Sequence, residues 1–337
     1  MTFNGQKIGV IGGGAWGTAL AQVLAKNERD VILWALEQEV VDSINSSHEN
    51  DMYLPAVSLH ENLKATSDLH EAAKADVLLL VTPAQYIRKT LESIKGELGT
   101  GKPIVICSKG IELDSGLLLT QVAEQVVPDA TIAVLTGPTF AREIAMGLPG
   151  AVTIACKSKD SATELQGIIG VPGFRPYATT DVIGTQLGGA IKNVIAIACG
   201  VVMGRQLGES ARAALLTRGV AEIARLGVAM GAKRETLLGM CGIGDLTLTC
   251  GSMQSRNFSL GAALGEGKSA NQILGERKAV TEGVHTVKST LSLAKKHAVD
   301  MPITETVNHL IEGDYSVDDA IEQMLNRPFS YEITEKS

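Results

Sequence analysis

The sequence lacks paired cysteine motifs and runs of positive charge, and each absence counts against a class of protein. The 337 residues include five cysteines, an odd number with no CxxC pair, which predicts free thiols in a reducing compartment and no disulfide framework. The formal net charge is −7 and no run of Lys and Arg occurs, so the chain lacks the basic face of a nucleic-acid-binding protein. A local basic pocket for a small anion is still compatible with this charge.

Several catalytic and targeting signatures are also missing. The sequence contains no HExxH, no Cys/His cluster with metal spacing, no G-x-S-x-G and no P-loop, so it predicts no metal site. Its first residues contain no apolar segment before a small-residue cleavage site, and we therefore expect a cytoplasmic protein. The 36 glycines have no three-residue period, which excludes collagen, and a hydrophobic fraction of 45% excludes general disorder.

One long apolar run covers residues 182–203. It could span a bilayer by its length, but Lys192 lies at its centre together with Gln186 and Asn193. A lone charge is costly at that depth, and no aromatic belt flanks the run. We therefore expect a helix buried inside a globular domain and no membrane span.

The first half of the chain alternates short apolar runs with helical patterns. The apolar runs cover residues 7–11, 31–34, 76–81, 104–107, 131–135 and 151–155, and helical periodicity covers 19–26 and 117–127. Continuous apolar strands separated by helices predict a parallel sheet covered on both faces. This order is typical of a doubly wound α/β fold.

The second half has helical periodicity and glycine punctuation but no convincing β-branched alternation. Helices are predicted over residues 211–230, 286–297 and 317–325. A length of 337 residues favours two domains. We therefore expect an α/β domain over residues 1–182, followed by an all-α domain over residues 183–337.

A glycine-rich turn follows the first predicted strand. Gly12, Gly14 and Gly17 form a G-x-G-x-x-G pattern between that strand and a helix, the context that identifies a dinucleotide-binding Rossmann turn. Gly12 permits the tight turn, Gly14 lets a pyrophosphate approach the backbone, and Gly17 lets the helix pack on the strand. Glu37 lies 20 residues after Gly17, about where an acid binds the adenosine ribose and repels a 2′-phosphate. We expect NAD or NADP as the cofactor, with a preference for NAD.

Lys192 is the most informative single residue, because it lies inside the long apolar run. Burial disfavours the charged ammonium and lowers the pKa of a lysine. A lysine that titrates near pH 7 can accept a proton from a hydroxyl and return it to a carbonyl. The alternative is a lysine that reaches solvent from a half-buried helix.

Three further segments carry candidate binding groups. Asp245 lies in a glycine-rich turn, where it could hold a lysine ammonium or a substrate hydroxyl. Ser255, Arg256 and Asn257 offer a hydroxyl, a guanidinium and an amide in a row, a set that suits a phosphate. Either segment could instead be a capped helix start. Lys109 follows the fourth predicted strand, at the edge where doubly wound sheets bind ligands.

Together these segments resemble the NAD(P)-dependent glycerol-3-phosphate dehydrogenases of the bacterial type. The resemblance covers nearly the whole chain and rests on several motifs in one order. They are GGGAWGTAL at 12–20, SKG at 108–110, GPTFA at 137–141, LGGAIKNV at 187–194, GDL at 244–246, SRN at 255–257, VTEG at 280–283 and MPITE at 301–305. The resemblance implies a Rossmann domain followed by a helical domain of the 6-phosphogluconate-dehydrogenase-like type.

The resemblance also implies an activity and a set of site residues. The activity is reversible hydride transfer between NAD(P)H and dihydroxyacetone phosphate, giving sn-glycerol 3-phosphate for phospholipid synthesis. Lys192 would be the proton acceptor. The other implied substrate residues are Lys109, Gly137, Thr139, Asp245, Ser255, Arg256 and Asn257. The implied dinucleotide residues are Ala15, Trp16, Lys109, Ala141, Arg256, Val280 and Glu282, in addition to Gly12, Gly14, Gly17 and Glu37.

One position departs from the bacterial pattern. Many bacterial members carry a basic or small polar residue after the second strand, whereas this chain has Leu36 and Glu37. That difference counts against carrying over a preference for NADP. Two other readings of the chain are another hydroxy-acid dehydrogenase of the same plan and a non-catalytic dinucleotide sensor. We expect a phosphorylated triose as the small-molecule partner. The oligomer we consider is a homodimer.

Overall fold

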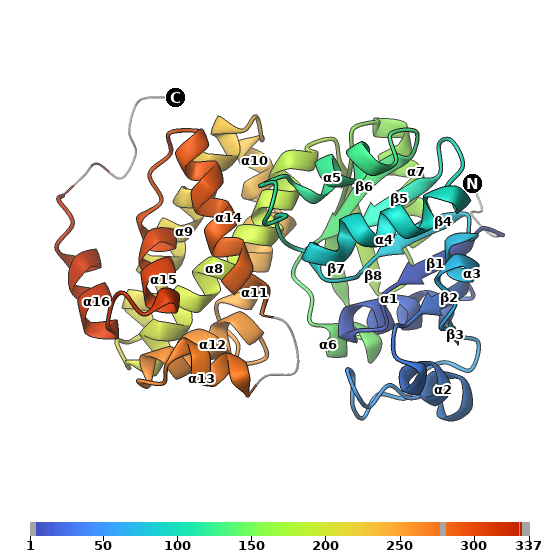
Figure 1. Cartoon of the computed structure of the whole chain (residues 1–337), viewed down its shortest axis with the longest axis horizontal. Coiled ribbons are helices and arrows are strands. Elements are labelled where there is room, and N and C mark those ends of the chain that lie inside the picture. The colour runs from blue at the N-terminus through green and yellow to red at the C-terminus, as the bar shows by residue number, and fades with distance from the viewer. Residues whose placement is uncertain (1–4, 277–280, 330, 332–337) are drawn as a thin grey trace.

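A computed structural model describes residues 5–276, 281–329 and 331. Figure 1 shows two halves side by side: a sheet with its helices, and a group of helices. We call residues up to Thr179 the sheet half and residues from Val182 onward the helical half. The helix that begins at Val182 starts beside the sheet and runs into the group of helices, so the halves meet along its first turns.

The sheet half contains eight strands in the order β3-β2-β1-β4-β5-β6-β7-β8. The strands are β1 (Lys7–Ile11), β2 (Asp30–Trp34), β3 (Lys64–Thr66), β4 (Val77–Leu80), β5 (Pro103–Ile106), β6 (Thr131–Thr136), β7 (Gly150–Cys156) and β8 (Phe174–Thr179). The pairs from β3 to β6 are parallel, which confirms the doubly wound expectation for that part.

The expectation of a wholly parallel sheet was wrong at one pair. Strand β7 runs antiparallel to β6, and β8 is parallel to β7. The chain between β6 and β7 covers residues 137–149 and holds only the five-residue helix α6 (Ala141–Ala145), whereas parallel strands are usually joined by a full crossover helix. Strands β3 and β8 lie at the two edges of the sheet and were not predicted.

Helices cover both faces of the sheet because neighbouring strand residues point to opposite sides. Val10 and Leu79 join a buried cluster with helices on one face, while Ile11 and Leu80 join a second cluster on the other. The helices are α1 (Ala15–Ala25), α2 (Gln38–Ser47), α3 (Leu69–Ala73), α4 (Ile87–Ile94), α5 (Leu119–Val126), α6 and α7 (Lys159–Ile169), with the single turns η1 (Ala84–Tyr86) and η2 (Lys95–Glu97).

The described part of the helical half contains helices and no strands, as expected. They are α8 (Val182–Gly204), α9 (Glu209–Ala229), α10 (Arg234–Leu237), the π-helical turn η3 (Met240–Gly244), α11 (Asp245–Thr249), α12 (Arg256–Gly265), α13 (Ala270–Gly275), α14 (Glu282–Lys296), α15 (Pro302–Glu312) and α16 (Val317–Leu325). Helix α14 begins four residues before the predicted start, and α16 has the predicted bounds.

Helix α8 is the centre of the helical half. It is long and apolar enough to cross a membrane by length and composition, but 89% of its most apolar window is buried inside the protein. Its closest neighbour is α12, because Gly200 and Gly204 face Gly261 and Gly265. A Cβ on Gly261 would lie 1.9 Å from the carbonyl oxygen of Ile197. The apolar run is therefore a core helix, as expected.

The first turns of α8 are capped by Asp181 and approach the end of β6. Asp181 accepts a hydrogen bond from the Gly184 amide (2.9 Å) and another from the Lys233 amide (2.8 Å). One turn further, a Cβ on Gly189 would lie 2.7 Å from Oγ1 of Thr136, at the end of β6. This close approach brings the middle of α8, and with it Lys192, to the carboxyl edge of the sheet.

Candidate active site

The glycine-rich turn after β1 has the geometry of a phosphate-binding turn. Gly12 has a φ of +131°, which glycine adopts readily and other residues rarely do. A Cβ on Gly17 would lie 1.9 Å from the Gly12 carbonyl oxygen, so helix α1 can pack this closely only with glycine there. A Cβ on Gly14 would meet nothing within 4 Å. The space above the amino end of α1 is therefore open to a ligand.

The amino end of α1 also suits an anion electrically. Gly14 is the N-cap and offers no side chain to the first amides of the helix, and the first turn holds no acidic residue. Free amides and the positive end of the helix dipole bind phosphate. These residues fit a dinucleotide pyrophosphate. Ala15 and Trp16 in this turn pack against the same buried cluster as Ala141 at the start of α6.

Glu37 lies beyond the carboxyl end of β2, the neighbour of β1. It is half-buried and is the N-cap residue of α2. The Tyr53 hydroxyl donates a hydrogen bond to Oε1 of Glu37 (2.8 Å). This contact and the burial of the ring both raise the pKa of Tyr53, with burial the larger cause. The carboxylate is thus held beside the turn where the adenosine ribose of a dinucleotide would lie.

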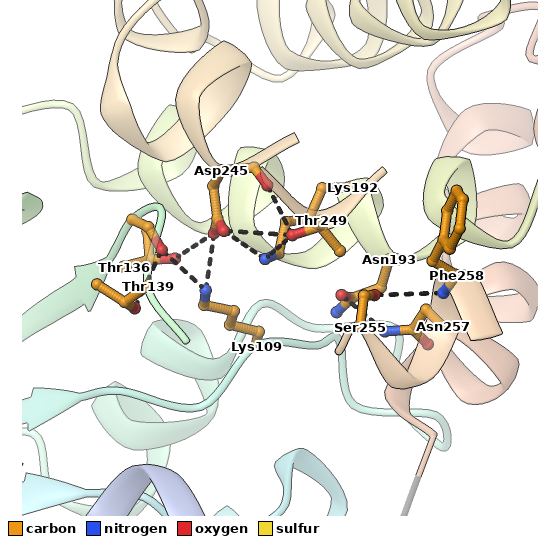
Figure 2. A network of polar contacts seen from close by, with 11 residues as sticks. Lys109, Thr136, Thr139, Lys192, Asn193, Asp245, Thr249, Ser255, Asn257 and Phe258 are labelled. Atoms are coloured by element: carbon orange, nitrogen blue, oxygen red, sulfur yellow. Dashed lines mark hydrogen bonds and ion pairs between the residues drawn. The ribbon is translucent and has the colours of Figure 1, made fainter. Parts of the chain in front are cut away.

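Lys192 on α8 is buried, with 6% of its surface exposed. Its Nζ forms an ion pair with Oδ1 of Asp245 and donates to Oγ1 of Thr249 (2.7 Å), as Figure 2 shows. Asp245 and Thr249 are the first and last residues of α11, so one short helix supplies both partners. The alternative of a lysine reaching solvent is therefore wrong.

Asp245 is the centre of this network and has no exposed surface. Its Oδ2 accepts a hydrogen bond from Nζ of Lys109 (2.7 Å) and one from Oγ1 of Thr136 (3.5 Å). Lys109 also donates to the Gly137 carbonyl oxygen (3.3 Å). Asp245 thus holds two lysines, one from each half of the molecule, which is the first of the two roles expected for it.

The electrostatics of this network tune Lys192. The pKa of Lys192 is lowered to about 7, and burial is the largest cause. Asp245 opposes that shift because its charge favours the ammonium, whereas the neighbouring Lys109 adds to it. An amine with a pKa near 7 exists in both protonation states at neutral pH. Lys192 can therefore act as a general acid in one direction of a reaction and as a general base in the other.

A second group of polar residues joins α12 to the lysine site. Ser255 is the N-cap of α12 and accepts a hydrogen bond from the Phe258 amide (3.2 Å), so this segment is a capped helix start, and a bound phosphate would lie at the same helix end. Nδ2 of Asn257 donates to Oδ1 of Asn193 (2.9 Å), and Oδ1 of Asn257 accepts from the Gly283 amide (3.0 Å). Asn193 follows Lys192 on α8, so these hydrogen bonds hold α12 and α14 beside the lysine. Figure 2 shows Asn193 and Asn257 next to Lys192.

Arg256 and Glu282 lie at the amino ends of α12 and α14. The Arg256 side chain is exposed and the Glu282 side chain is half-buried. Oε1 of Glu282 accepts from the Ala84 amide of η1 (3.4 Å), which connects the helical half to the turn after β4. Burial raises the pKa of Glu282, and the Ala84 amide and Arg256 oppose that shift. Val280 lies outside the described residues.

Comparison with known proteins identifies the family. Residues 7–162 match the family described as NAD-dependent glycerol-3-phosphate dehydrogenase N-terminus, and residues 181–322 match the corresponding C-terminus. This chain belongs to the NAD-dependent glycerol-3-phosphate dehydrogenase family. A glycerol-3-phosphate dehydrogenase (NAD(P)+) from Parvibaculum lavamentivorans is 54% identical over 332 residues, which cover 98% of this chain and 100% of that protein. The protein of the same name from Rhodospirillum rubrum is 54% identical over 326 residues, covering 96% of this chain and 93% of that protein.

A solved structure agrees with this assignment. The crystal structure of glycerol-3-phosphate dehydrogenase from Coxiella burnetii is 36% identical in sequence and superimposes with a TM-score of 0.91. The match covers 96% of this chain and 99% of that one. The expected family, its Rossmann and helical plan, and its dependence on NAD or NADP are therefore confirmed.

In this member of the glycerol-3-phosphate dehydrogenase family, three site residues were not singled out from the sequence. Thr136 and Thr249 contact Asp245 or Lys192, and Asn193 bonds Asn257. Thr249 could have been predicted from the sequence, since it follows Asp245 by four residues and such positions share one face of a helix. Thr136 could not have been predicted in this way, because only the fold brings the end of β6 beside α11. Gly137 and Thr139 lie in the loop that follows β6, where the Thr139 hydroxyl donates to the Gly137 carbonyl oxygen (3.4 Å).

Proposed function

We propose that this chain catalyses the reversible reduction of dihydroxyacetone phosphate to sn-glycerol 3-phosphate with NADH or NADPH. The observation that carries the proposal is the buried Lys192, held by Asp245 next to Lys109, at the same edge of the sheet as the dinucleotide turn. Relatives of nearly equal length carry the name of this activity. We further propose that the product supplies phospholipid synthesis.

Lys192 is the proposed catalytic residue. In the reducing direction its ammonium donates a proton to the developing alkoxide oxygen of the substrate. In the oxidising direction its neutral amine removes the proton from the hydroxyl. A pKa of about 7 suits both directions near neutral pH. Asp245 and Thr249 are proposed to orient Nζ, which limits the motion of the lysine before the reaction.

The phosphate end of the substrate is proposed to bind near α12. Arg256 can grip a phosphate with two parallel hydrogen bonds, and Ser255 and Asn257 flank it in the same helical turn. Lys109 would share the substrate with the dinucleotide. The remaining proposed substrate contacts are Gly137, Thr139, Lys192 and Asp245. Binding energy at the phosphate would then hold the carbonyl end beside Lys192.

The dinucleotide is proposed to bind along the carboxyl edge of the sheet. When bound, its nicotinamide ring supplies or accepts the hydride. The open amino end of α1 and the uncapped amides there fit its pyrophosphate. The proposed contacts are Gly12, Gly14, Ala15, Trp16, Gly17, Glu37, Lys109, Ala141, Arg256, Val280 and Glu282. Glu37 favours NAD, because its carboxylate repels a 2′-phosphate.

Residues 1–182 are proposed as the dinucleotide-binding domain and residues 183–337 as the domain that completes the substrate site. We further propose that the protein is a homodimer and is located in the cytoplasm. Free cysteines agree with a reducing compartment, since Cys107, Cys156, Cys199, Cys241 and Cys250 are all unpaired and buried.

A steady-state assay tests the proposed activity. Purified chain is mixed with dihydroxyacetone phosphate and either NADH or NADPH, and oxidation of the cofactor is followed by its absorbance. We expect turnover with both cofactors and a higher kcat/KM with NADH. Glyceraldehyde 3-phosphate and a panel of 2-oxo acids serve as comparison substrates. Turnover of a 2-oxo acid in preference to dihydroxyacetone phosphate would contradict the proposal.

A further inference from the structure

The segment between α2 and β3 connects the two ends of the proposed dinucleotide site. Asn50 is buried, with 1% of its surface exposed. Its Nδ2 donates to the Gly13 carbonyl oxygen (2.9 Å) in the glycine-rich turn and to Oγ1 of Thr18 (2.8 Å) on α1. The Tyr53 amide, in turn, is bonded to Oδ1 of Asn50 (3.3 Å).

Tyr53 completes this connection at the ribose end. Its ring packs against the core of the sheet half, and its hydroxyl donates to Oε1 of Glu37 (2.8 Å). A chain of contacts thus runs from the glycine-rich turn through Asn50 and Tyr53 to Glu37. The turn also touches the end of β2 directly, since a Cβ on Gly13 would lie 2.5 Å from Cβ of Ala35. The position of the carboxylate is therefore tied to the position of the turn.

We propose that Tyr53 is a positioning residue for cofactor choice: its hydroxyl holds the Glu37 carboxylate where it accepts the adenosine ribose hydroxyls and excludes a 2′-phosphate. The proposal rests on the NAD preference proposed above. A free glutamate side chain has several rotamers and could swing away from an incoming 2′-phosphate. The hydrogen bond from Tyr53 removes that freedom, and a hydrogen bond to a charged group is among the stronger ones in proteins. Tyr53 therefore makes the repulsion by Glu37 effective.

Tyr53→Phe tests the proposal, because it removes one oxygen atom and leaves the ring packed. Steady-state kinetics with dihydroxyacetone phosphate are measured with NADH and with NADPH. We expect KM for NADH to rise about fivefold to tenfold and KM for NADPH to stay equal or fall, which lowers the NADH/NADPH ratio of kcat/KM by a similar factor. We expect kcat to change less than twofold, because the ribose end lies far from the reacting atoms.

Two competitive inhibitors isolate the ribose end from the chemistry. ADP-ribose and its 2′-phosphorylated form differ only at the group that Glu37 would meet. Tyr53→Phe should weaken ADP-ribose and reduce the discrimination between the two inhibitors. Tyr177→Phe is the matched control, since Tyr177 lies on β8 at the opposite edge of the sheet from β2 and β3. It should leave both inhibition constants unchanged.

The outcomes separate this proposal from the one on which it rests. The ratio for the wild-type chain alone tests the NAD preference, and a wild type that favours NADPH contradicts that preference. The Tyr53 proposal is tested by the change in the ratio on substitution. Equal changes for both cofactors, or a lower melting temperature with an unchanged ratio, would mean a structural role and would overturn it. Glu37→Gln should change the ratio in the same direction, and combining it with Tyr53→Phe should add little.

Discussion

The charge of Asp245 raises the pKa of Lys192 against the larger effect of burial, and Asp245→Asn tests this directly. The aspartate has no exposed surface and contacts both Lys192 and Lys109. Its charge raises the pKa of Lys192, against burial and against Lys109, which both lower it. The asparagine keeps the size of the side chain but loses the charge. The pKa of Lys192 should therefore fall below its value of about 7.

The size of the shift can be bounded. Opposite unit charges about 4 Å apart attract by roughly 4 kcal/mol at an effective dielectric constant of about 20. One pKa unit corresponds to about 1.4 kcal/mol, so the shift should be about 1 to 3 units. At a pH above the pKa, each further unit by which the pKa falls lowers the fraction of the ammonium form about tenfold. Reduction of the carbonyl at pH 7.5 should therefore slow by roughly tenfold to a thousandfold.

The assay is the pH dependence of kcat/KM for reduction of dihydroxyacetone phosphate, which reports the pKa of the free enzyme. In the wild-type chain kcat/KM should fall as the pH rises through about 7, because the donating ammonium is lost. In Asp245→Asn the fall should occur at lower pH. The midpoint separates this effect from weaker substrate binding, which lowers the whole curve. Asp129→Asn, an exposed carboxylate before β6, is the control with the same chemical change. A midpoint that stays in place or rises would refute the reasoning.

Three further predictions concern the phosphate, the core and stability. Arg256→Ala should raise KM for dihydroxyacetone phosphate by about a hundredfold, the equivalent of about 3 kcal/mol for a lost charged contact, and steady-state kinetics should give a much smaller loss with unphosphorylated dihydroxyacetone. Gly261→Ala should lower the free energy of unfolding by about 1–3 kcal/mol because its Cβ meets the Ile197 carbonyl oxygen, whereas Gly275→Ala, which meets nothing within 4 Å, should not. Glu222 is a buried residue of α9, and burial raises its pKa to about 7. The native state therefore binds its proton more tightly than the unfolded state, and the free energy of unfolding should fall by about 3 kcal/mol as the pH rises from about 4.5 to 7. Urea unfolding of Glu222→Gln should show no such pH dependence from this residue.

The parts of the fold that were predicted correctly have strong local signals. Strands β1, β4 and β5 are continuous apolar runs, and such runs occur where both faces of a sheet are covered. Strand β3 has only three residues, Lys64–Thr66, and no apolar pattern. Strand β8 contains Pro176. Proline disfavours the prediction of a strand but is tolerated at a sheet edge. The direction of β7 depends on the path of the connection after β6, which lacks a full crossover helix, and a residue pattern within the strand does not carry that information.

The candidate site divides in the same way. Lys192 stands out in the sequence because it is a charged residue within an apolar helix. The glycine-rich turn stands out because its glycines lie between a predicted strand and a predicted helix. Asp245 was predicted to hold either a lysine ammonium or a substrate hydroxyl, but its pairing with both Lys192 and Lys109 depends on three segments meeting at the sheet edge. The contact of Tyr53 with Glu37 depends on the path of a loop. Contacts of that kind follow from tertiary packing and have no signal in sequence spacing.

The most direct test of the account is Lys192→Ala, because the proposed chemistry depends on one buried amine. Loss of a general acid–base group costs about a hundredfold to ten-thousandfold in rate. We predict that kcat for dihydroxyacetone phosphate falls by at least about a thousandfold, while the Kd for NADH, measured by fluorescence titration, changes less than threefold. That combination would assign the proton transfer to Lys192. An unchanged kcat, or a loss of turnover explained fully by lost NADH binding, would contradict the central claim.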